Sequence, residues 1–167
     1  ALREDPDIIF VGEMRDLETI SMAITAAETG HLVFAKLHTK GAVQSIDRII
    51  DVFPASQQEQ IRAQLADVLE MVVSQVLIPS EDKRKRCLAC EVMITTSAIR
   101  HNIREKKTFQ IPTLIETGSN IGMQTLDKSL IALVNAGKIS KKDALPWVSD
   151  RKSFESLFNR SAEIPGF

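Results

Sequence analysis

The chain has 167 residues, 44% of them apolar, which is enough to build the buried core of a single domain. Lys and Arg number 21 against 22 Asp and Glu, so no net field draws the chain to nucleic acid or to an anionic membrane. The two cysteines exclude the disulfide framework of a small secreted domain and favour the cytoplasm, and no apolar run reaches the roughly 20 residues that cross a bilayer.

The first part of the sequence predicts a strand, a helix and a second strand. Residues 8–11 are a short apolar run of β-prone side chains that ends at Gly12-Glu13. Asp16 is a candidate N-cap for a helix whose apolar positions keep helical spacing until Gly30. Residues 31–38 predict the second strand. A unit of this kind builds a parallel sheet.

Two helices are expected next. The first has apolar residues at positions 46, 49, 50 and 53 on one face and ends before Pro54. Ser56 and Glu59 then form the pattern of a capping box, and apolar residues from 61 to 76 continue at helical spacing. We therefore expect one long helix that Pro79 interrupts.

The remaining sequence predicts one more strand and a helical end. The charged residues 80–86 indicate a surface turn, and residues 87–94 a strand. Residues 95–97 offer caps for a short basic helix at 98–105. From Pro112 onward the pattern is helical, except for residues 159–167, which we expect to fray. The expected fold class is therefore α/β with an all-helical end.

Glu13 follows an apolar strand, at the edge where α/β sheets bind ligands. An apolar run followed by Glu is by itself more often only the end of a strand. The segment Ile8–Asp16 nevertheless resembles a Walker B segment, whose second acid orients the attacking water of an NTPase. The usual pattern has an acid at the site of Gly12 too, and secretion-type ATPases show the Gly-Glu variant found here.

A second segment, Thr29–Thr39, is similar to the His box of the secretion-type motor ATPases. Together with residues 1–7 and 12–16 it identifies the chain as a member of that family. His38 ends the predicted strand on the same sheet edge as Glu13, whereas His31 begins it. Their seven-residue separation in the sequence puts the two histidines on opposite faces of a regular strand, which argues against a shared metal ion.

Further motifs resemble the type IV pilus retraction branch of this family. The sequence AIRHNIRE at residues 98–105 looks like the element that marks the branch, from which it departs at His101 and Asn102. Residues 111–112, 117–119 and 122–127 also match. In all, the resemblance covers roughly residues 1–145, and several ordered motifs carry it.

The resemblance implies a partial RecA-like P-loop NTPase core in residues 1–97, mostly a parallel sheet whose first strands are missing. It also implies a helical C-terminal subdomain in residues 98–158; the lack of periodicity beyond it predicts a disordered tail in residues 159–167. The implied activity is ATP hydrolysis with Mg²⁺ in a cytoplasmic homo-hexamer, peripheral at the inner membrane. There it would pull on a pilus platform protein, with no nucleic-acid partner and no insertion into the membrane.

The same resemblance implies a role for each candidate residue. Glu13 would orient the attacking water, with Mg²⁺ near it but no protein side chain as a direct metal ligand, and His38 would contact the γ-phosphate or its water. The further expectations are nucleotide contacts by Gly12, Arg15 and Thr39, a structural role for His31, and coupling of hydrolysis to retraction by Arg100 and Arg104.

No window of the sequence fits the phosphate-binding pattern G-x-x-x-x-G-K-[ST]. Its single Gly-Lys pair, Gly137-Lys138, is followed by Ile139 and lacks the earlier glycine. We therefore expect the chain to be a piece of a longer gene product and inactive alone. Two alternatives remain open. The chain is a non-catalytic module that packs against motor subunits, or it belongs to a pilus-assembly or type II secretion ATPase, which usually has Ile at the position of Met14.

Two short motifs have a plainer interpretation. Cys87 and Cys90 have the spacing of half a zinc site, but no second pair exists, so packing is expected. The basic run at residues 83–86 can touch phosphate, yet such a run in a neutral chain is usually a solvated turn.

Overall fold

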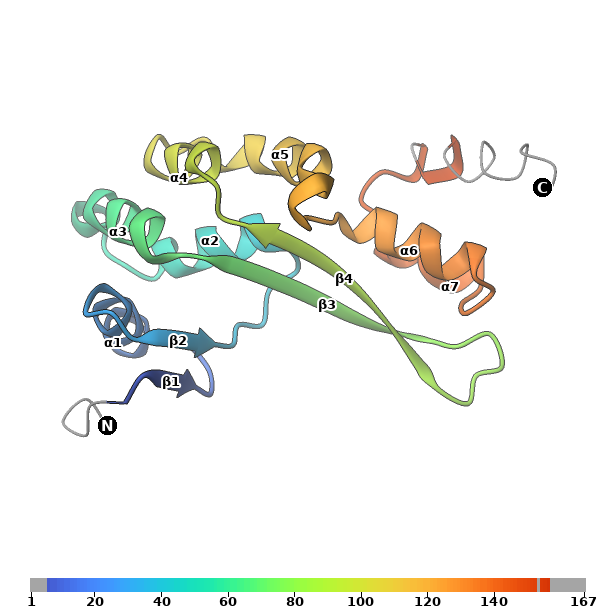
Figure 1. The fold of residues 1–167 in the computed structure, drawn as a ribbon, viewed down its shortest axis with the longest axis horizontal. Coiled ribbons are helices and arrows are strands. Elements are labelled where there is room, and N and C mark those ends of the chain that lie inside the picture. Colours follow the sequence, from blue (N-terminus) through green and yellow to red (C-terminus); the bar gives the residue numbers. More distant parts are fainter. Residues whose placement is uncertain (1–5, 153, 157–167) are drawn as a thin grey trace.

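The computed structural model describes residues 6–152 and 154–156, so the expected fraying at 159–167 and most of the motif at 1–7 lie outside the described residues. Figure 1 shows a long hairpin, β3–β4, that crosses the molecule, with α1, α2, α3 and the pair β1–β2 gathered at one end of it. The helices α4 to α7 follow the hairpin toward its tip.

The elements in chain order are β1 (Ile8–Val11), α1 (Leu17–Glu28), β2 (Leu32–Ala35), α2 (Ala42–Asp51), α3 (Ala55–Val68), β3 (Met71–Pro79), β4 (Arg86–Ile94), α4 (Ser97–Arg104), η2 (Thr108–Gln110), α5 (Ile111–Thr117), η3 (Gly118–Ile121), α6 (Leu126–Asn135), α7 (Lys141–Ala144) and η4 (Leu145–Trp147). The expected α/β fold with a helical end is confirmed.

The predicted strand, helix, strand unit is present. β1 and β2 pair in parallel, with Ile8 opposite Leu32 and Val11 opposite Ala35. Asp16 caps α1, since its carboxylate accepts a hydrogen bond from the backbone N–H of Thr19 at 2.8 Å. β2 is shorter than the predicted span 31–38, because the ladder to β1 ends at Ala35.

The long helix predicted up to residue 76 is wrong. α3 ends at Val68, Leu69 turns to an extended conformation, and residues 71–79 form β3. The expected capping box is wrong too, because the helix begins at Ala55 with Pro54 as its N-cap and no side-chain cap. Valines at spacings of four fit a helix, but β-branched side chains also favour strands, and pairing with β4 decides between the two.

The predicted strand at 87–94 is confirmed as β4. It pairs with β3 in antiparallel register over nine positions, from Met71 opposite Ile94 to Pro79 opposite Arg86. In the described residues this hairpin is a sheet of its own, separate from the parallel pair. The parallel sheet is therefore present only as its two strands β1 and β2, and the hairpin is the larger element that the sequence did not predict.

The buried apolar side chains form two clusters. The first joins α1 to α5 and includes Ile20, Ile50 and Ile103, each fully buried. The second lies under α6 and α7 and includes Leu130 and Phe154. The hairpin contributes to both clusters, because Met93 lies in the first and Ile78 and Ala89 in the second. The polar Asn102, on α4, is also buried at 6% exposure.

Both sheets have apolar side chains that are exposed to solvent. On β1 and β2 the exposed fraction is 77% for Phe10, 59% for Ile8 and 52% for Phe34. On the hairpin, Met71, Val73, Leu77 and Leu88 are each about half exposed. Apolar patches of this kind mark surfaces that other chain segments cover.

Candidate functional site

Glu13, Arg15 and His38 form one cluster at the carboxyl ends of β1 and β2. The carboxylate Oε1 of Glu13 lies 2.6 Å from Nε of Arg15 and 3.2 Å from Nε2 of His38. The backbone N–H of Met14 donates to the carbonyl of Lys36 at 3.0 Å, which holds the two strand ends together. The predicted shared edge of Glu13 and His38 is therefore present.

The charges around Glu13 keep it ionised. The hydrogen bond from Arg15 lowers the pKa of the Glu13 carboxyl, and the positive charges of Arg15, His38 and Lys36 act in the same direction. The reciprocal bond raises the pKa of Arg15. A carboxylate with a lowered pKa is a weak proton acceptor but a permanent hydrogen-bond acceptor, which suits the orientation of a water molecule.

The side chains of the cluster differ in exposure. Only 24% of the Glu13 side chain is exposed, against 75% for Arg15 and 64% for His38. Arg15 and His38 can thus turn toward an incoming ligand while Glu13 stays in place. An added Cβ at Gly12 would meet no described atom within 4 Å, so the space around it does not require glycine.

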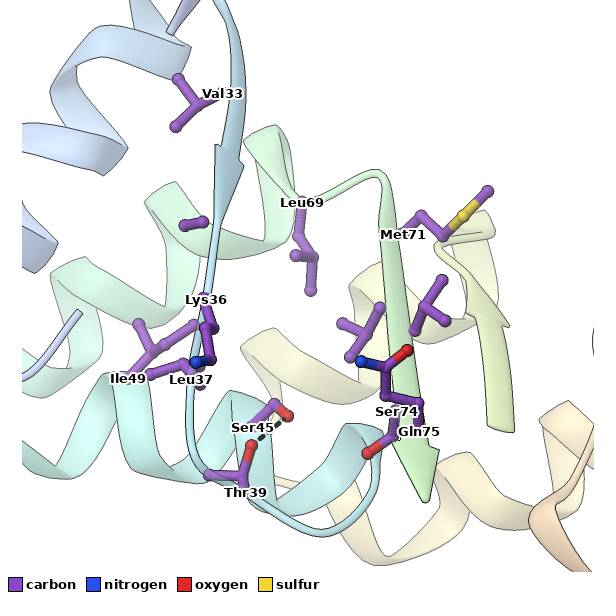
Figure 2. A pocket seen from close by; sticks show the side chains of 13 residues that line it. Val33, Lys36, Leu37, Thr39, Ser45, Ile49, Leu69, Met71, Ser74 and Gln75 are labelled. Atoms are coloured by element: carbon purple, nitrogen blue, oxygen red, sulfur yellow. Dashed lines mark hydrogen bonds between the residues drawn. The ribbon is translucent and has the colours of Figure 1, made fainter. Parts of the chain in front are cut away.

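A groove of about 350 Å³ lies between β2 and β3 (Figure 2), and Lys36, Leu37 and Thr39, close to His38 in the sequence, line it. Its polar lining includes Lys36, Thr39, Ser45 and Ser74, and Figure 2 shows Thr39 and Ser45 joined by a hydrogen bond of 2.7 Å between their hydroxyls. Lys36 and Ser45 were missed by the sequence interpretation. Lys36 stands inside the His-box segment, two positions before His38, and that place was the available signal.

The loop after His38 is anchored by groups that no local pattern revealed. The N–H of Gly41 donates to Ser74 Oγ at 2.7 Å, and the N–H of Ala42 donates to Glu91 Oε1 at 2.8 Å. Gly41 has a φ of 95°, a conformation that favours glycine. These bonds connect the loop that carries Thr39 to both strands of the hairpin.

His31 lies away from the cluster, at the end of α1. Its Nδ1 is 3.0 Å from the carbonyl oxygen of Ala26 and 3.0 Å from Oγ1 of Thr29. These contacts satisfy polar groups at a helix terminus, where carbonyls lack partners within the helix.

Arg100 and Arg104 reach back from α4 to the end of α3. Arg100 donates from Nη1 to the carbonyls of Ala66 and Asp67, both at 2.6 Å, and from Nη2 to Glu70 Oε1 at 2.7 Å. Arg104 pairs with the carboxylate of Asp67. The two arginines share one face of α4, as the four-residue spacing predicted, and here that face holds the last turn of α3.

Within the described residues, no group of three or more His, Cys, Asp or Glu side chains could hold a metal ion. Cys87 and Cys90 are both free thiols, and the thiol of Cys87 lies against the carbonyl of Lys138. None of the described helices is long and apolar enough to cross a membrane.

Comparison with known proteins gives consistent matches. Residues 1–141 match the family model of the type II/IV secretion system proteins. The chain is 56% identical over 144 residues to the type IV pilus retraction ATPase PilT of Pseudomonas aeruginosa, covering 86% of this chain and 42% of that protein. It is 52% identical over 144 residues to the twitching motility protein of Neisseria gonorrhoeae, covering 86% of this chain and 38% of the relative.

A crystal structure of the pilus retraction motor PilT with bound ADP superposes with a TM-score of 0.83 at 47% identity, covering 93% of this chain and 43% of that one. The chain thus spans about two-fifths of the length of the relatives that it matches.

Proposed function

Since the chain belongs to the type II/IV secretion system protein family, we propose that it is the C-terminal part of a hexameric ATP-hydrolysing motor that drives type IV pilus retraction. The contact of His38 with Glu13 at the carboxyl ends of β1 and β2 carries this proposal. The similarity to two proteins named for retraction and twitching motility supports the retraction branch over assembly or type II secretion.

In the proposed site, Glu13 orients the attacking water. Its carboxylate is ionised and mostly shielded from solvent. Arg15 forms an ion pair with this carboxylate when no phosphate is near. A γ-phosphate attracts a mobile guanidinium more strongly than a carboxylate does, because it carries more negative charge and can also accept a bidentate contact. Arg15 then leaves Glu13 free to accept from water, and His38 contacts the same water or the phosphate.

The phosphate-binding loop would enter beside the groove between β2 and β3. These strands line the groove from opposite sides without pairing with each other, and strands of one sheet lie about 4.8 Å apart. A strand placed there by a segment outside these 167 residues would join the two sheets. Lys36 and Thr39 would then face the loop that follows it, with Gly12 close to Glu13.

ATP, with Mg²⁺ near Glu13, supplies the phosphoryl group in this proposal. The ring would be a homo-hexamer that contacts a pilus platform protein from the cytoplasm, at the inner membrane. Residues 1–97 would belong to the ATPase core and residues 98–158 to the helical subdomain. Arg100 and Arg104 would couple hydrolysis to retraction, through the bonds that tie α4 to the end of α3.

The exposed apolar side chains of β1 and β2 favour a second candidate, a non-catalytic module that only packs against motor subunits. One experiment separates the two. The complete gene product, with whatever segment precedes Ala1, is purified, and its ATP turnover is measured beside pilus retraction in cells. The motor proposal requires turnover. The packing module is favoured if the complete product is folded and hexameric but hydrolyses no ATP.

A further inference from the structure

The turn between β3 and β4 is a compact, charged tip. Figure 1 shows it extending away from α1 to α3 at the far end of the hairpin. Residues 81–86 are all exposed, and the last four of them are Lys83, Arg84, Lys85 and Arg86. Backbone hydrogen bonds close the turn. The N–H of Ser80 donates to the carbonyl of Lys85 at 2.9 Å, and the N–H of Lys83 donates to the carbonyl of Ser80 at 2.8 Å.

A second basic segment lies against this turn. The N–H of Glu81 donates to the carbonyl of Lys138 at 2.9 Å, and the ammonium of Lys83 pairs with Asp143. The connection from α6 to α7 is thereby held on the hairpin tip. We call the combined surface the basic tip; it consists of Lys83, Arg84, Lys85, Arg86, Lys138, Lys141 and Lys142.

Three carboxylates lie beside these cations; Glu81 is exposed, whereas Asp82 and Asp143 accept hydrogen bonds from neighbouring groups. Asp82 accepts from the hydroxyl of Ser80 at 2.6 Å and from the N–H of Arg84 at 3.1 Å. Asp143 accepts from Ser140 and Lys83. No described hydrogen bond or ion pair engages the side chains of Arg84 and Lys85. The surface therefore presents an excess of positive charge, although the whole chain has a net charge of −1.

The make-up of the basic tip identifies its partner. A specific protein interface has a core of apolar and aromatic anchors. Residues 80–86 contain no apolar side chain, and the nearest exposed large apolar side chains, Leu77 and Leu88, lie opposite each other on the strands behind the turn. Spread positive charge without an anchor fits a surface whose negative charge is also spread, and headgroups of an anionic bilayer have that property.

We propose that the basic tip is a peripheral binding surface for anionic phospholipid headgroups. It binds without inserting, because the turn is polar throughout. The proposal is independent of ATP hydrolysis: it assigns a surface on the opposite end of the hairpin from Glu13 and His38.

The expected strength follows from the number of cations. Each Lys or Arg near an anionic bilayer strengthens binding about fivefold, and salt weakens it because charges farther apart than about 10 Å are screened at 0.1 M. Removal of two outward cations should therefore lower partitioning about twenty- to thirtyfold.

The test is flotation of the 167-residue chain with vesicles of phosphatidylglycerol and phosphatidylcholine in equal parts, and with phosphatidylcholine alone. The variant is Arg84→Gln with Lys85→Gln. Both side chains are exposed, and no described hydrogen bond or ion pair of the fold involves them. The matched control is Lys106→Gln with Lys107→Gln, which removes the same charge from an exposed site after α4. Circular dichroism confirms that each variant is folded.

The proposal expects the chain and the control to float with anionic vesicles at low salt and the basic-tip variant to stay behind. It is overturned if the chain does not bind anionic vesicles, or if the control loses as much binding as the variant, since overall charge would then explain the result. It is also overturned if polyglutamate binds the basic tip and vesicles do not, because the partner would then be an acidic protein.

Discussion

The imidazole Nε2 of His38 lies 3.2 Å from the Oε1 of Glu13, although the two residues follow different strands. The parallel pairing of β1 and β2 produces this contact, because it brings both carboxyl ends to one edge. Arg15 approaches the same oxygen from the following loop. A single carboxylate is thus held between two cationic or protonatable groups that remain exposed.

Glu13→Gln in the proposed full-length motor keeps the size of the side chain and removes its charge. Turnover of ATP should fall by about two to four decades while ATP binding survives, as expected for the loss of a water-orienting base. Steady-state hydrolysis and nucleotide binding are measured on the same preparation. Glu18→Gln, an exposed acid on α1, is the control. Unchanged turnover in the Glu13 variant would place the base elsewhere.

The 167-residue chain alone should neither hydrolyse ATP nor bind it tightly. Its groove offers Lys36 and Thr39, but no glycine-rich loop grips the β- and γ-phosphates. Isothermal titration calorimetry on the pure chain measures this directly. An affinity in the micromolar range would contradict the prediction and would mean that the described residues suffice for phosphate binding.

Arg100→Ala should destabilise the fold. It removes the donors to the carbonyls of Ala66 and Asp67. These carbonyls lie in the last turn of α3, where the helix itself supplies no donor. We expect a loss of about 1–3 kcal/mol in the free energy of unfolding, the usual cost of unsatisfied polar groups that are partly buried. Urea denaturation measures it. Arg100→Lys should recover only part of the loss, since an ammonium lacks the planar fork.

Arg104→Ala tests coupling with less disturbance. Its ion pair with Asp67 is 43% and 62% exposed on the two side chains, so the cost in stability should stay below about 1 kcal/mol. In the full-length motor we expect near-normal ATP turnover with reduced retraction, measured as twitching in the same strain. A parallel collapse of turnover and motility would instead assign Arg104 to the active site or to the assembly of the ring.

Stability should decline when the pH falls below about 4, the ordinary range of Asp and Glu carboxyls. The pKa of Glu13 is lowered chiefly by Arg15, and that of Asp16 chiefly by the N–H of Thr19. Lys83 lowers the pKa of Asp143. A carboxyl whose folded pKa is lowered contributes stability above its unfolded pKa and loses it as the pH falls through the folded value.

Thermal unfolding from pH 7 to pH 2 checks this pH dependence. Asp16→Asn should flatten it, because an amide can still cap α1 but does not titrate. An Asp16→Asn profile with the same slope as the parent chain would show that this carboxyl contributes nothing to acid unfolding.

Local patterns located several elements well. β1, α1 and β4 were predictable because their apolar spacing, caps and turn residues lie within a few positions of one another. β3 was not, since Val72 and Val76 satisfy a helical spacing and an alternating one equally. Its pairing with β4, in which Val72 lies opposite Met93, overrides the local ambiguity.

The sequence alone determined the family, the strand β1 and the candidate pair Glu13 and His38, because each depends on residues close together or on the general geometry of parallel strands. Only the tertiary structure decided where Arg100 and Arg104 are directed, and that Lys83 in the hairpin turn meets Asp143 of α7. Such contacts join segments far apart in the chain, and their energy exists only after the chain has folded. The same holds for charge, since a near-neutral composition gave no indication that the fold gathers its cations at one tip.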